Sequence, residues 1–128
     1  MTIENAIRLF ESENYRESIE LCQEILATQP RNVEINYLSG QIGVKIENWD
    51  SAKHFFETTL SIDPTFHKGR LALAECLFEM GDKAAAIIQY EVLLADIPNA
   101  YIARLNAGDI LVSLYRIEEA IEQYQTAL

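Results

Sequence analysis

The sequence predicts an all-α protein in which pairs of antiparallel helices repeat along the chain. The first indication is that Pro30, Pro64 and Pro98 are each 34 residues apart. The second is that four other sets of similar residues recur at the same spacing of 34, and we call each set a column. The columns are Leu26, Leu60, Leu94 and Leu128; Ala6, Gly40, Ala74 and Gly108; Ser18, Ala52, Ala86 and Ala120; Cys22, Phe56, Tyr90 and Tyr124. The third is a composition of 49% hydrophobic residues with only three Pro and five Gly, which favours helix.

The 34-residue step divides the 128 residues into nearly four units, at about 1–32, 33–66, 67–100 and 101–128. We expect one repeat domain over 1–128, because each unit buries its apolar face against the next. The last unit stops within a helix, before the turn and the proline that should follow. This predicts that the chain is the N-terminal part of a longer protein.

Each unit contains two helical patterns separated by a short break. In the third unit, apolar residues recur at helical spacing over 71–78 and again over 86–94, and Gly81-Asp82 separates the two runs. Gly is suited to end a helix and Asp to cap the next one. The other breaks fall at 13–15, 47–49 and 115–117. The second unit is the least regular, since Gly43 and Thr59 replace larger apolar residues, so we expect its first helix to be loosened.

The charge excludes several classes of partner. The chain has 20 acidic and 10 basic residues, a net charge of −10, and the excess is spread over all four units. Nucleic acids and anionic membrane surfaces require clustered Lys and Arg, so neither is an expected partner. No apolar run approaches the roughly 20 residues that span a bilayer. No secretory signal is visible at the N-terminus and the two cysteines form no disulfide framework, so we expect a cytoplasmic protein.

The period, the small-residue columns, the aromatic column and the Gly81–Ala86 run together make the chain resemble the tetratricopeptide repeat family. This resemblance covers the whole chain and implies a right-handed superhelical array, an α-α solenoid whose inner, concave face is lined by the first helix of each unit. It also implies that a peptide or partner helix binds in this groove. The chain departs from the family pattern where Thr2, Asn36, Arg70 and Arg104 replace the aromatic residue that often opens the first helix.

No motif in the sequence indicates catalysis, a metal or a cofactor. Gly-rich phosphate loops, paired histidine ligands and nucleophile elbows are absent. We expect His54 and His67 to be solvated surface residues. We also expect Cys22 and Cys76 to be small buried hydrophobes and not reactive thiols.

Four columns of the first helices are predicted to face the groove, two of them apolar and two turning acidic toward the C-terminal end. The candidate binding residues are Tyr37, Gln41, Lys45, Leu71, Glu75, Phe78, Glu79, Leu105 and Asp109. Such a groove suits a partner with apolar anchors and some Lys or Arg. An alternative interpretation is that the apolar columns simply pack against neighbouring helices. A carboxylate clamp for an acidic peptide terminus is not expected, since only Lys68 fits that pattern.

These features predict a protein–protein interaction scaffold without catalytic activity of its own. Two alternatives remain open. The chain could be the N-terminal substrate-recruiting repeat region of a larger enzyme, such as a glycosyltransferase or sulfotransferase. It could also be a scaffold that assembles with itself, because an uncapped last helix would leave apolar side chains uncovered: Leu114, Ile121, Tyr124 and Leu128.

Overall fold

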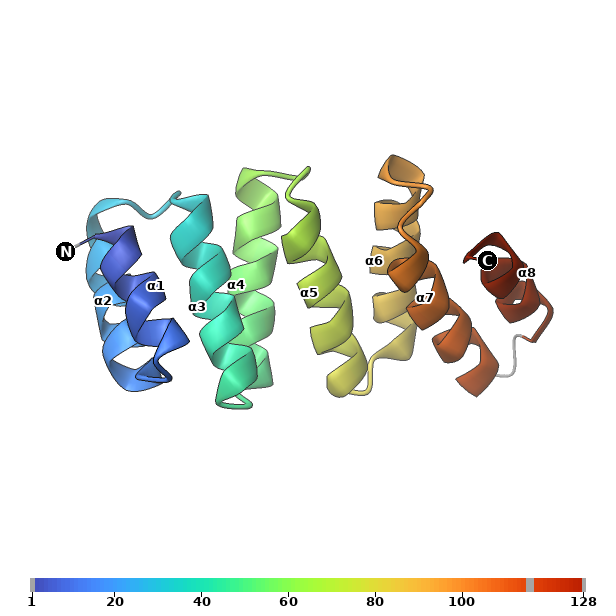
Figure 1. Cartoon of the computed structure of the whole chain (residues 1–128), viewed down its shortest axis with the longest axis horizontal. Coiled ribbons are helices and arrows are strands. Elements are labelled where there is room, and N and C mark those ends of the chain that lie inside the picture. The colour runs from blue at the N-terminus through green and yellow to red at the C-terminus, as the bar shows by residue number, and fades with distance from the viewer. Residues whose placement is uncertain (1, 115–116, 128) are drawn as a thin grey trace. The chain divides into compact units, whose positions relative to one another are not determined.

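A computed structural model describes residues 2–114 and 117–127, and these residues form eight α-helices and no strand. The helices are α1 (Ile3–Glu11), α2 (Tyr15–Thr28), α3 (Val33–Lys45), α4 (Trp49–Ile62), α5 (His67–Glu79), α6 (Lys83–Asp96), α7 (Tyr101–Ser113) and α8 (Ile117–Ala127) (Figure 1). The predicted all-α array of helix pairs is confirmed. The chain divides into two compact units, Met1–Gly69 and Arg70–Leu128, which are described separately below.

The first unit consists of the pairs α1/α2 and α3/α4 and the start of α5. Side-chain oxygens cap three of its helices: Thr2 accepts a hydrogen bond from the Asn5 amide, Asn32 from the Ile35 amide, and Asn48 from the Ser51 amide. These bonds satisfy amides that have no partner within the helix. The unit therefore folds with well-defined helix starts that follow directly from its Thr and Asn residues.

The core of the first unit lies between the paired helices. Its hydrophobic cluster consists of Ala6, Cys22, Ile25, Ile35, Leu38 and Ile42, all buried. Gly40 lets α3 approach α4 closely, since a Cβ at this position would lie 2.4 Å from Cε1 of the buried Phe56. The small column that the sequence shows is thus needed for close packing within a helix pair.

The first helix of the second repeat, which the sequence predicts to be loosened, is a regular helix in the structure. Helix α3 is regular over 13 residues, the same length as α5. Gly43 faces the α4 backbone, and a Cβ there would lie 2.9 Å from the amide nitrogen of Ala52. Thr59 is fully buried and donates its hydroxyl to the Phe55 carbonyl at 2.8 Å. The residues that looked like weak substitutes for leucine fit a closer contact.

The second compact unit contains most of α5 together with α6, α7 and α8. Its core includes Leu73, Ala74, Leu77, Ala86, Ile87, Tyr90, Leu93, Leu94, Ala103, Ala107, Ile110 and Leu111, all buried. Gly108 repeats the role of Gly40, because a Cβ at this position would lie 2.9 Å from Cε1 of Tyr124. The 34-residue period of the sequence therefore corresponds to a repeated helix-to-helix contact.

Apolar side chains remain exposed near the last helix, as the sequence predicts. Leu114 is 36% exposed and Ile121 is 50% exposed. Tyr124 is half-buried against Gly108, and Leu128 lies outside the described residues. Within the part of the chain that the structure describes, no helix is both long enough and apolar enough to cross a membrane.

Candidate protein-binding face

The nine predicted binding residues are divided between the two compact units. Tyr37, Gln41 and Lys45 follow one another along α3 in the first unit. The Tyr37 ring packs edge-on against Phe66 at 5.0 Å between centroids and lies 5.9 Å from Phe56. Tyr37 therefore helps to hold the first unit together. Gln41 is half-buried, and among these three residues only Lys45 is exposed.

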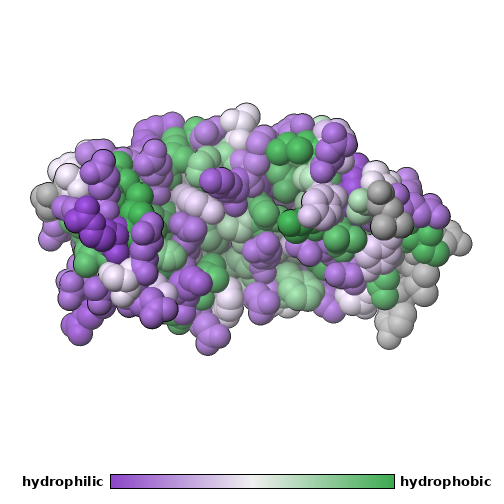
Figure 2. All heavy atoms as spheres, in the orientation of Figure 1, coloured by the Kyte–Doolittle hydropathy of each residue, from purple (hydrophilic) through white to green (hydrophobic). Residues whose placement is uncertain are grey.

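The other six residues lie on α5 and α7 of the second unit. We use "the α5/α7 face" for a set of seven residues: Leu71, Glu75, Phe78, Glu79, Leu105, Asp109 and Val112. Three of its apolar side chains are exposed, at 42% for Phe78, 36% for Leu105 and 45% for Val112. Figure 2 shows hydrophobic patches among hydrophilic ones over these two helices. Exposed apolar groups beside acids give this face an amphipathic character.

The three acids of the α5/α7 face are exposed and form no ion pair within the described residues. Glu75 is exposed as a whole residue, but nearby protein atoms exclude part of the water around its carboxyl group, and this desolvation raises its pKa. Asp109 accepts a hydrogen bond from the Tyr124 hydroxyl, and this bond raises the pKa of Tyr124. A cation placed beside Glu75 would favour its charged form and oppose the effect of desolvation.

Both arginines of α5 and α7 are engaged by the second helix of their own repeat. Arg70 Nη1 donates to Gln89 Oε1 at 2.6 Å, and Arg104 Nη1 donates to Gln123 Oε1 at 3.0 Å. Arg104 Nε also donates to the Pro98 carbonyl at 2.9 Å. The two Arg–Gln pairs are one repeat apart, and both arginines stand where the family often has an aromatic residue. Because these guanidinium groups point to other partners, the acids dominate the charge of the α5/α7 face.

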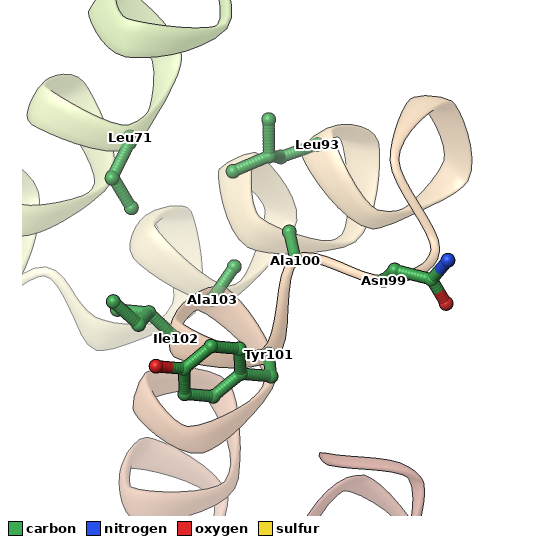
Figure 3. Close-up of a pocket in the computed structure, with 7 residues that line it drawn as sticks. All are labelled: Leu71, Leu93, Asn99, Ala100, Tyr101, Ile102 and Ala103. Atoms are coloured by element: carbon green, nitrogen blue, oxygen red, sulfur yellow. The ribbon is translucent and has the colours of Figure 1, made fainter.

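A pocket of about 290 Å³ opens beside this face, where α6 ends and α7 begins. Its lining consists of Leu71, Leu93, Asn99, Ala100, Tyr101, Ile102 and Ala103. In Figure 3, Leu71 and Leu93 approach it from one side and the start of α7 from the other, while the Asn99 side chain points away. Of these residues, the sequence identified only Leu71 as a candidate. A comparison of the first turns would have indicated Tyr101 and Ile102, which stand where the earlier repeats have Val33-Glu34 and His67-Lys68.

The two cysteines and the two histidines differ in how far they are buried. Cys22 and Cys76 are buried as predicted, and burial raises the pKa of the Cys22 thiol. His54 is exposed as predicted, but the prediction for His67 is wrong: it is half-buried, and its Nδ1 is buried without a hydrogen-bond partner among the described residues. The described residues contain no group of three or more His, Cys, Asp and Glu side chains that could hold a metal ion.

Repeated helix pairs with small residues between the helices define an α-helical repeat protein. A model of the tetratricopeptide repeat family matches residues 47–107, from the turn before α4 into α7. Over these residues the chain is similar to the tetratricopeptide repeat, in agreement with the resemblance that the sequence shows.

Several solved structures share this fold. A crystal structure of MamA aligns over 95% of this chain and 71% of its own, with 20% identity and a TM-score of 0.90. A second MamA crystal structure aligns over 98% of this chain and 69% of its own, with 17% identity and a TM-score of 0.92. MamA AMB-1 aligns over 98% of this chain and 74% of its own, with 22% identity and a TM-score of 0.86. No curated protein matches the sequence.

Proposed function

We propose that this protein is an interaction scaffold whose α5/α7 face binds a peptide or helix of a partner protein. The observation that carries the proposal is the combination of exposed Phe78, Leu105 and Val112 with three acids that have no ion pair among the described residues. Apolar anchors and unneutralised carboxylates are complementary to a segment that carries apolar and basic side chains. The tetratricopeptide repeats support a role in protein binding.

The acids contribute mainly specificity in this proposal, and the apolar side chains contribute most of the affinity. Exposed charge pairs are worth only about 0–1 kcal/mol each. Full burial of an apolar side chain of the partner against Phe78 or Leu105 is worth roughly 1.5–3 kcal/mol. We therefore expect acidic segments to be rejected and basic amphipathic segments to be accepted.

A selection from random dodecapeptides displayed on phage tests this function. We expect the enriched sequences to be positively charged and to contain apolar residues. Their binding should be lost in a variant that carries Glu75→Lys, Glu79→Lys and Asp109→Lys. The matched control carries Glu91→Lys, Asp96→Lys and Glu122→Lys, which reverses three exposed acids on α6 and α8 with the same change in net charge. We expect this control to retain binding.

The contrast between these two variants decides the proposal. Equal binding by the α5/α7 variant and by wild-type protein would overturn it. Because Asp109→Lys removes the bond from Tyr124, a second variant with only Glu75→Lys and Glu79→Lys guards against a folding defect. Circular dichroism should show the same helix content in all variants.

A further inference from the structure

Two large apolar side chains stand at the mouth of the α6–α7 pocket. Tyr101 is 56% exposed and Ile102 is 53% exposed. The equivalent residues of the preceding repeat are His67 and Lys68, which are polar. Two large apolar groups at the start of a helix contribute little to the core when half of each side chain is in water. An apolar group of another molecule that bound in the pocket would cover the exposed surface of both side chains.

The size and lining of the pocket suit a single side chain. At about 290 Å³ it is slightly smaller than the pockets of roughly 300–1,000 Å³ that hold small-molecule ligands. Leu71 and Leu93 form one wall, and Ala100, Ile102 and Ala103 line the opposite side (Figure 3). With Asn99 directed away, the lining offers few polar groups to orient a cofactor. An aliphatic or aromatic side chain is the group that this lining accommodates.

The acids stand at defined distances from the pocket along the same helices. Glu75 follows Leu71 by one helical turn, a rise of about 6 Å at 1.5 Å per residue. Asp109 follows Ile102 by seven residues, or about 10 Å. An extended peptide advances about 3.3 Å per residue, so these distances correspond to two or three peptide residues.

From this arrangement we infer that the pocket anchors one large apolar side chain of an extended partner segment, whose Lys or Arg two or three residues away pairs with Glu75 or Asp109. This inference rests on the proposed function and specifies its partner. Charge complementarity identifies the occupant. Arg70 and Arg104 are hydrogen-bonded to Gln89 and Gln123. Lys68, the remaining base of α5 and α7, is exposed and forms no ion pair with the acids among the described residues, so a cation of the partner can pair with them. The recognition element is therefore an apolar residue with a base at a fixed spacing.

Fluorescence anisotropy with synthetic peptides tests the inference. The probe is a labelled peptide Gly-Ser-Leu-Gly-Lys-Lys-Gly-Ser, and three further peptides change one feature each: Leu to Ser, both Lys to Glu, or a spacing of seven residues between Leu and the first Lys. We expect each change to weaken binding, with loss of the Leu anchor costing about tenfold or more in affinity. The variant Ile102→Ser should weaken binding of the Leu peptide and leave that of the Ser peptide unchanged.

A matched control variant is Ile88→Ser on α6, which removes an isoleucine of similar exposure, 57%, away from the pocket. We expect it to bind the Leu peptide like the wild type. Equal affinity for the Leu and Ser peptides would overturn the anchor while leaving the acidic face intact if Glu75→Lys still abolishes binding. Failure of all peptides to bind would overturn both proposals. Concentration-dependent self-association that Ile102→Ser abolishes would show a second copy in the pocket and would also overturn the anchor.

Discussion

Tyr90 occupies the centre of the second compact unit, where three helices meet. Its ring is 2% exposed, and the Asn106 amide donates to its hydroxyl at 3.4 Å. Burial raises the pKa of Tyr90 to about 12, with the charge of Glu75 acting in the same direction and the Asn106 bond opposing it. The unfolded phenol titrates near pH 10. The folded state therefore holds this proton more tightly, and the stability linked to it is present below pH 10 and lost as the pH rises toward 12.

We predict that Tyr90→Phe reduces the fall in unfolding free energy between pH 10 and pH 12. At pH 7 the variant should differ from wild type by no more than about 1 kcal/mol, because the lost hydrogen bond is long and Phe56 fills the equivalent position in the first unit. Urea denaturation across this pH range measures both effects. An unchanged alkaline slope in the variant would show that Tyr90 is not the group responsible.

At the scale of the elements, the break between the helices has one repeated conformation in the first three pairs. Glu13, Glu47 and Gly81 are one repeat apart, and all have a positive φ, at 64°, 57° and 85°. In each turn the following amide donates to the carbonyl five residues earlier, for example from Asp82 to Leu77 at 2.9 Å. This is the helix-ending motif in which glycine is preferred, because a side chain is strained in the left-handed region.

Replacing the glycine of this turn and introducing a glycine at an equivalent position should have opposite effects on stability. We predict that Gly81→Ala lowers the free energy of unfolding by about 1 kcal/mol, although no atom lies within 4 Å of the added Cβ. Glu47→Gly should raise it by a few tenths to about 1 kcal/mol. Glu47→Ala is the control, since it keeps a Cβ in the same conformation. Chemical denaturation gives all three values, and a stable Gly81→Ala protein would argue against backbone strain in this turn.

The helices and the breaks between them could be predicted because they depend on residue types that are close together in the sequence. Proline, glycine and capping residues mark the helix ends, and a period of 34 residues removes the ambiguity of any single mark. The quality of packing within the pairs could not be predicted in the same way. Gly43 looks like a missing leucine in the sequence, but the approach of the Ala52 backbone leaves room only for glycine. Such contacts depend on the distance between two helices, which no single column reveals.

At the scale of the molecule, the repeat pattern identified the class of protein and the acids of the proposed binding face. The acids at Glu75, Glu79 and Asp109 follow from their columns, and the structure places all three at exposed positions of one compact unit. The pocket at the α6–α7 turn did not follow, because it depends on how the chain enters α7 after Pro98. The superhelical twist and the apolar and basic character of the partner remain predictions. The binding of a partner segment by the α5/α7 face is the central claim.

Methyl NMR spectroscopy of Ile-, Leu- and Val-labelled protein, titrated with a peptide enriched in the phage selection, tests this claim most directly. The chain offers two sets of exposed methyl groups in the second unit. We predict chemical-shift changes at Leu105 and Val112 on the α5/α7 face and at Ile102 beside it, and unchanged shifts at Ile88 and Val92 on α6. Changes confined to Ile88 and Val92, with Leu105 and Val112 unaffected, would contradict the account.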